Sequence, residues 1–111
     1  MSENPKFKHA EIELSILAKA ISNPARVLIL KELASRKSCV CGEIVNVLPL
    51  AQATVSQHLK ELKEIGLIKG TVDGAKSCYC IDWDKFEFMT SEFLVFFKEI
   101  ISQKPTNEEC C

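Results

Sequence analysis

The two cysteines of Cys39-Val40-Cys41 are the residues whose type and spacing most directly suggest chemistry. Thiolates are soft ligands that select thiophilic ions. Trivalent arsenic or antimony takes three thiolates, whereas cadmium, lead or zinc usually takes four ligands. Ser38 is a suitable N-cap for a short helix over about 39–47, which would place both cysteines in the first turn. The helix dipole would favour their thiolates there.

This spacing also predicts a mechanism. Helix positions two apart point about 200° away from each other around the axis. One ion can therefore be held by Cys39 and Cys41 only if the first turn distorts. We expect ion binding to unwind the start of this helix and to shift the helix that follows it.

A third ligand must come from elsewhere in the chain. The last residues, Cys110 and Cys111, lie on a tail that can fold back onto the ion, and we rank them first. Cys78 and Cys80 rank second, because they alternate with Tyr79 on a predicted strand and so share one side of it. Both are equally well explained as small core residues.

A helix predicted over 52–65 carries the second informative pattern. Val55, Leu59 and Leu62 recur at helical spacing, which indicates one apolar face. Short polar side chains between them suit hydrogen bonding to base edges from a helix in a major groove. These candidates are Gln52, Thr54, Ser56, Gln57 and His58, with Lys60 and Lys76 as phosphate contacts. For His58 a half-buried position at the helix edge is an equal alternative.

The remaining elements follow from local signals. Helices are predicted over 9–21 and 24–34, the second opened by Asn23-Pro24. Gly66 ends the helix over 52–65, and strands over 67–72 and 76–81 flank an Asp73-Gly74 hairpin turn. A last helix spans 84–103. The predicted fold is mainly α with a small β-hairpin, a winged helix-turn-helix in the order α-α-α-α-β-β-α.

The chain should form one domain over 1–111, with a loose arm at 1–8 and a cysteine-bearing tail at 104–111. The last helix has more apolar residues than one domain face requires. We therefore expect a homodimer that buries this excess through the first and last helices.

Composition limits the class of protein. The chain has 111 residues, of which 47% are hydrophobic and 26% charged, with a net charge of −1. Such a chain is globular, and its charge argues against generic polyanion binding. No signal peptide and no apolar run long enough for a bilayer is visible, so we predict a cytoplasmic protein without a membrane partner. Its cysteines would then be thiols for metal or redox work.

Four pieces of the sequence, in order, resemble the arsenic-repressor (ArsR/SmtB) family of metal-sensing transcriptional regulators. They are Asn23-Pro-Ala-Arg-Val-Leu-Ile-Leu-Lys-Glu-Leu33, Cys39-Val-Cys41-Gly-Glu43, Gln52-Ala-Thr-Val-Ser-Gln-His-Leu59, and Gly66-Leu-Ile with Gly74-Ala-Lys-Ser-Cys-Tyr-Cys-Ile81. Each piece alone is weak, but the ordered set is specific. One departure is Ala75, since the family often has Arg after the hairpin glycine.

The resemblance implies a homodimeric repressor, not an enzyme, that leaves double-stranded operator DNA when a metal or metalloid binds. Its two recognition helices would read an inverted repeat. The expected inducer is arsenite or antimonite, with cadmium, lead or zinc as alternatives, and no organic cofactor is expected.

Three other functions remain open. A repressor of the same fold could sense oxidants or reactive sulfur through cysteine pairs. Cys39, Cys41, Cys78 and Cys80 could form a structural zinc module. A thiol oxidoreductase is disfavoured, because Cys-x-Cys is not Cys-x-x-Cys and no βαβ pattern surrounds it.

Overall fold

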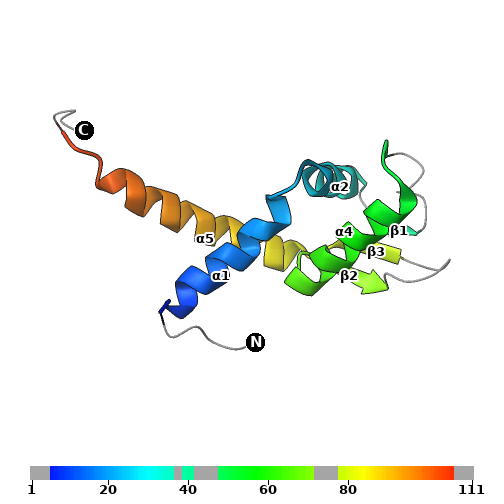
Figure 1. Cartoon of the computed structure of the whole chain (residues 1–111), viewed down its shortest axis with the longest axis horizontal. Coiled ribbons are helices and arrows are strands. Elements are labelled where there is room, and N and C mark those ends of the chain that lie inside the picture. Colours follow the sequence, from blue (N-terminus) through cyan, green and yellow to red (C-terminus); the bar gives the residue numbers. More distant parts are fainter. Residues whose placement is uncertain (1–5, 37–38, 42–47, 72–77, 107–111) are drawn as a thin grey trace.

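The computed structural model describes residues 6–36, 39–41, 48–71 and 78–106. Its described elements are helices at both ends of the chain and a small antiparallel sheet between them (Figure 1). In chain order they are α1 (His9–Ala18), the 3-10 turn η1 (Lys19–Ile21), α2 (Pro24–Ser35), β1 (Val40–Cys41), α4 (Gln52–Ile65), β2 (Ile68–Thr71), β3 (Cys78–Ile81) and α5 (Trp83–Ser102).

The termini of α2, α4 and α5 have clear local causes. The side chain of Asn23 accepts a hydrogen bond from the Ala25 amide at 2.8 Å, as the Asn-Pro signal predicts. Gly66 ends α4 in the left-handed region, with φ +100°. The Asp82 carboxylate accepts from the Lys85 amide at 3.1 Å, so α5 begins one residue earlier than predicted.

The sheet has the strand order β1-β3-β2, with both neighbouring pairs antiparallel. In the β2–β3 hairpin, Ile68 is opposite Ile81 and Gly70 is opposite Tyr79. In the β1–β3 pair, Val40 is opposite Tyr79 and Cys41 is opposite Cys78. The hairpin is the predicted wing, although its Asp73-Gly74 turn lies outside the described residues.

The prediction that a helix begins at Cys39 is wrong. Val40–Cys41 is strand β1, so neither Cys39 nor Cys41 lies in the first turn of a helix. The reason is a tertiary contact: the β-branched Val40, only 3% exposed, pairs with Tyr79 and packs into the core. The rest of that predicted helix, with its N-cap Ser38, lies outside the described residues.

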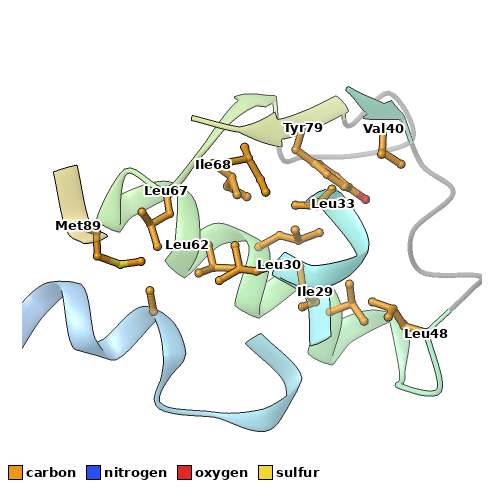
Figure 2. Packing of buried hydrophobic residues seen from close by; sticks show 14 of the residues in the cluster. Ile29, Leu30, Leu33, Val40, Leu48, Leu62, Leu67, Ile68, Tyr79 and Met89 are labelled. Carbon is orange, nitrogen blue, oxygen red and sulfur yellow. The ribbon is translucent and has the colours of Figure 1, made fainter. Parts of the chain in front are cut away.

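Figure 2 shows how the core joins α2, α4 and the sheet. From α4 the buried residues are Val55, Leu59 and Leu62, which are the three on which its apolar face was predicted. Tyr79 reaches from β3 toward Leu33 of α2 (Figure 2). A fully buried aliphatic side chain contributes about 1.5–3 kcal/mol, so this face holds α4 firmly on the domain.

Helices α1 and α5 pack against each other, crossing in the view of Figure 1, and extend away from the sheet. The molecule is elongated as a result, with extents of 56 × 32 × 24 Å. Met89 is buried, whereas the second half of α5 leaves large apolar side chains exposed. These are Leu94, Val95, Phe96, Phe97, Ile100 and Ile101. The arrangement confirms the predicted fold class, a mainly helical winged helix-turn-helix with a β-hairpin.

Candidate DNA interface and thiol site

The outer face of α4 presents most of the side chains that were predicted to contact DNA. Gln52, Thr54, Gln57 and Lys60 are exposed, and Ser56 is half-buried. The N-cap residue is Ala51, which makes no side-chain capping hydrogen bond. The first amides of α4 thus have no capping acceptor from the side chain of the N-cap residue, and amides at a helix N-terminus can bind a phosphate group.

Of the other predicted contacts, Gln57 already has a partner within the protein, and Lys76 cannot be placed. The Gln57 amide nitrogen donates to Glu61 Oε1 at 3.2 Å, a bond that DNA would have to replace. Lys76 lies outside the described residues.

His58 is held at the edge of α4 by a residue of α2. Arg26 Nε donates to His58 Nδ1 at 3.1 Å, and the ring is half-buried. Burial and the Arg26 charge both lower the pKa of His58 from its usual 6.5. Of the two positions that the sequence allows for His58, the structure therefore has the packed imidazole at the helix edge.

Arg26 itself connects three elements. Besides His58, it donates to the Lys19 carbonyl oxygen at 2.7 Å and forms an ion pair with Glu61 of α4. Its position three residues after Asn23 gave no sign of this role, because its partners are 7, 32 and 35 residues away in the chain. Sequence reasoning missed it for that reason.

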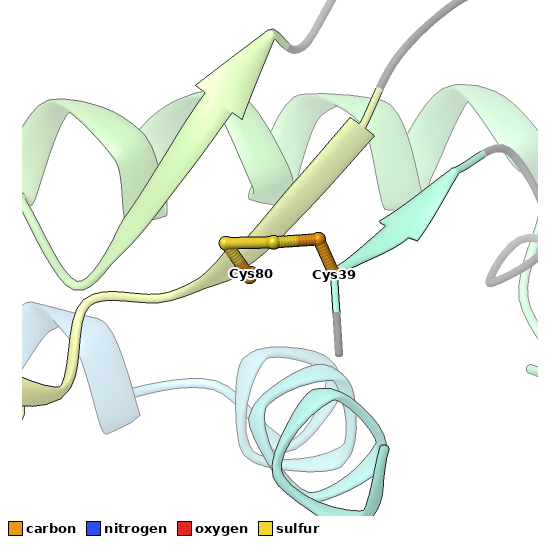
Figure 3. The surroundings of a disulfide bond; sticks show 2 residues. All are labelled: Cys39 and Cys80. Carbon is orange, nitrogen blue, oxygen red and sulfur yellow. A yellow bond between two sulfur atoms is a disulfide. The ribbon is translucent and has the colours of Figure 1, made fainter. Parts of the chain in front are cut away.

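Cys39 and Cys80 form a disulfide that joins β1 to the wing strand β3 (Figure 3). Their Cα atoms are 4.4 Å apart, and 41 positions separate them in the chain. This Cα separation is typical of directly opposed residues at a non-hydrogen-bonded position of an antiparallel pair. The sulfurs therefore meet without any change in the backbone.

Side chains alternate between the two faces of β1 and β3, so the buried core residues lie on one face and the cysteines on the other. Val40, Tyr79 and Ile81 are buried, whereas Cys39 is exposed and Cys78 and Cys80 are half-buried. Residues two apart on a strand occupy one face. The backbone register puts Cys41, for which only the backbone is described, directly opposite Cys78. The β1–β3 ladder thus has two facing pairs of cysteines, Cys39 with Cys80 and Cys41 with Cys78, on either side of the buried Val40–Tyr79 pair.

The expected set of three thiol ligands is not seen in the described residues. No three His, Cys, Asp or Glu side chains gather there so as to hold a metal ion. The structure brings Cys80 to Cys39, while Cys110 and Cys111 lie outside the described residues. Cys41 lies on strand β1 and Cys39 directly precedes it, so the 200° divergence expected from a helix does not apply. The expected unwinding mechanism has no helical turn to act on at these two residues.

A helix-turn-helix unit with an exposed polar helix and a β-hairpin wing defines the class of protein as a winged-helix DNA-binding regulator. The model of the bacterial regulatory protein, arsR family, matches residues 23–69, from the start of α2 into β2. An uncharacterized HTH-type transcriptional regulator of Methanocaldococcus jannaschii is 41% identical over 68 residues, which cover 60% of this chain and 75% of that protein.

Two further comparisons extend over more of the chain. The arsenical resistance operon repressor of Bacillus subtilis is 31% identical over 94 residues, covering 84% of this chain and 85% of that repressor. A crystal structure of an ArsR family transcriptional regulator, RHA00566, has the same fold, with a TM-score of 0.66 at 18% identity over 95% of this chain and 100% of that one.

The chain belongs to the arsR family of transcriptional regulators. Members of this family are repressors that bind operator DNA, typically as dimers, and are not enzymes. In the described part of the chain, no helix combines the length and apolar character needed to cross a membrane.

Proposed function

We propose that this repressor leaves its operator when a trivalent arsenic or antimony ion binds the cysteines of the β1–β3 ladder. The observation that carries the proposal is the direct contact between Cys39 and Cys80, because two sulfurs close enough to bond can also share one soft ion once they are reduced. The relative from Bacillus subtilis named for arsenical resistance supports this class of inducer.

A third thiolate is required for a trivalent metalloid. Cys41 and Cys78 face each other one step along the same ladder, and Cys110 and Cys111 are the alternatives in the tail. Cadmium, lead or zinc would need four ligands from the same set. The proposal therefore keeps all six cysteines as candidates and assigns the central pair to Cys39 and Cys80.

The route from the ion to DNA passes through the wing. Sulfurs that share an ion at bonds of about 2.3 Å lie farther apart than the two sulfurs of a disulfide. Ion binding would therefore change the spacing of β1 and β3, and β3 pairs with β2, which follows α4 directly after Gly66 and Leu67. The expected effect is a shift of the wing relative to the recognition helix.

The DNA contacts proposed are Gln52, Thr54, Ser56 and Gln57 on α4, with Lys60 and Lys76 at phosphates. His58 is proposed to orient α4 through Arg26 and not to contact bases. A dimer of this single winged domain would set two α4 helices about 34–36 Å apart on an inverted repeat. Acting on operator DNA, the protein would work in the cytoplasm.

We propose that the dimer forms through α1 and α5. Between these two helices lies an apolar groove of about 770 Å³, lined on α5 by Phe93, Phe96, Phe97 and Ile100. Exposed apolar surface of this extent is typical of protein interfaces.

The test is a titration of the operator complex with arsenite, antimonite, cadmium and zinc in the presence of a reductant. Wild type should release DNA with arsenite or antimonite, while Cys39→Ser and Cys80→Ser should stay bound at the same concentrations. A variant that ends at Glu109 loses only Cys110 and Cys111. It therefore distinguishes the ladder from the tail as the source of the third ligand. Normal release from both serine variants would overturn the proposal.

A second candidate is a repressor that responds to oxidation, and the Cys39–Cys80 disulfide favours it. In this case the oxidant alone would release the operator as the disulfide forms, and arsenite would have no effect on the reduced protein. Counting free thiols in the same samples distinguishes the two candidates.

A further inference from the structure

A cavity of about 540 Å³ lies beside the Cys39–Cys80 disulfide. It lies between the C-terminal end of α2, the sheet and the start of α5, and both cysteines line it. Figure 3 shows that α2 runs close to this pair of strands. Its volume is within the range of sites that hold small organic molecules.

The polar lining of this cavity is cationic. Arg36 and Lys69 contribute to it, and none of the described residues that line it is Asp or Glu. Glu32 accepts from Arg36 Nε at 2.9 Å and offsets part of the guanidinium charge. Lys69 is exposed on β2. A concave surface with these charges favours an anionic ligand.

The rest of the lining suits an organic group. Leu33 and Ile81 are apolar, and Trp83, the single tryptophan of the chain, is 55% exposed at the same cavity. The cavity thus combines three features in one site: the apolar surface of the tryptophan ring, two cations that can pair with a negative charge, and a reactive disulfide bond. None of these residues is among the DNA contacts proposed above.

We propose that this cavity binds a small anionic thiol that exchanges with the Cys39–Cys80 disulfide. The thiolate of the ligand attacks the sulfur of Cys39, the more exposed of the two cysteines, and forms a mixed disulfide. The sulfur of Cys80 leaves as a thiolate. Arg36 and Lys69 hold the anionic group of the ligand in the cavity and favour the thiolates on both sides of the exchange.

A second molecule of the same thiol completes the reduction. Its thiolate attacks the ligand sulfur of the mixed disulfide, which releases the oxidised ligand and the thiolate of Cys39. Two thiols are thus oxidised to one disulfide, while the protein disulfide gains two electrons and becomes a dithiol. The dithiol is the state that the proposed ion response requires, so the cavity would return an oxidised repressor to its responsive form.

The test uses the full-length oxidised protein without DNA and three small thiols of different charge. These are 3-mercaptopropionate (anionic), 2-mercaptoethanol (neutral) and cysteamine (cationic). Each rate is divided by the rate of the same thiol with bis(2-hydroxyethyl) disulfide, which removes differences in intrinsic reactivity. Acid quenching and peptide mass mapping locate the adduct, and the emission of Trp83 follows the reaction in time.

We expect the normalised rate of 3-mercaptopropionate to exceed that of cysteamine by about fivefold or more at low ionic strength, and the excess to shrink with salt. Lys69→Gln should remove most of this preference. Lys31→Gln, an equal change of charge at an exposed position of α2 outside the cavity, should leave it unchanged.

Equal normalised rates for the three thiols, an unchanged preference in Lys69→Gln, or adducts only at cysteines other than Cys39 would each overturn the inference. The inference uses the same disulfide as the oxidation candidate above. Because the assay contains no DNA and no metalloid, its failure would leave both proposals for operator release standing, and their failure would leave the exchange site standing.

Discussion

Arg26 Nε donates a hydrogen bond to His58 Nδ1 at 3.1 Å and so joins α2 to the recognition helix α4. The same guanidinium forms an ion pair with Glu61 on the next turn of α4 and donates to the Lys19 carbonyl oxygen. The side chain of Arg26 is only 12% exposed. These bonds stabilise one orientation of α4 about its own axis. In the proposed DNA interface, that orientation sets which side chains face DNA.

Replacing Arg26 should therefore weaken both the fold and DNA binding. Arg26→Ala removes the ion-pair partner of Glu61 and leaves the Lys19 carbonyl without this donor. We expect a loss of about 1–3 kcal/mol in the free energy of unfolding, measured with urea. Operator affinity should fall in conditions where the variant remains folded. Arg36→Ala, which also removes an arginine paired with a glutamate, is the matched control and should leave operator affinity unchanged.

His58 should make stability depend on pH. Its pKa in the folded protein is lowered, first by burial and then by Arg26, so the unfolded chain binds more protons just below pH 6.5. Stability from the neutral ring is fully present above pH 6.5 and is lost as the pH falls through the folded pKa. Urea unfolding from pH 7.5 to 5.5 should show this loss in wild type.

His58→Gln is the control for this pH dependence, because the amide oxygen can accept from Arg26 but does not titrate. The decline in stability below pH 6.5 should be smaller in this variant. An equal decline in the two proteins would assign it to other groups.

The wing depends on Gly70. Its φ is +121°, and a Cβ there would collide with the carbonyl oxygen of Cys78 on β3. Gly70→Ala should cost about 3 kcal/mol of unfolding free energy, from backbone strain and from separation of the two strands. Gly66→Ala is the comparison, since its φ is +100° but its Cβ would only touch the flexible Lys85 side chain at 3.4 Å. We expect a cost of about 1–2 kcal/mol there, measured by thermal or urea unfolding.

Local patterns predicted α2 and α4 of the DNA-binding unit well. The bounds of α4 agree with the prediction, because its apolar spacing and the stop at Gly66 are both signals within the segment. The site at Cys39 was mispredicted because its structure depends on a distant strand. Ser38-Cys39 resembles a helix start, but Val40 pairs with Tyr79, and no periodicity within 39–47 contains that information. For the same reason the sequence did not single out the contact between Cys39 and Cys80.

Gln57 is expected to read sequence and not only to bind the backbone of DNA. It is exposed on α4, and its amide now donates to Glu61. Gln57→Ala should weaken operator binding by about 1–3 kcal/mol and binding to unrelated DNA by much less. Lys60→Gln should weaken both by similar amounts and reduce the salt slope by about one. Equal losses on both DNAs for Gln57→Ala would make it a positioning contact.

The exposed apolar half of α5 should hold the dimer together. Phe97 is 54% exposed and lines the groove between α1 and α5. Phe97→Glu places a charge in this surface and should give a monomer in sedimentation, with its helical content retained. Operator affinity should fall by about a hundredfold, because each monomer then binds one half-site.

Ser91→Glu is the matched control, because it adds the same charge to α5 at an exposed residue outside the groove. It should remain a dimer with full affinity for the operator. If Phe97→Glu were also still a dimer, the interface would have to lie on another surface, and the exposed set on α5 would need a different partner. Monomers that bound the operator as tightly as wild type would instead show that pairing of the two winged domains does not contribute to DNA affinity.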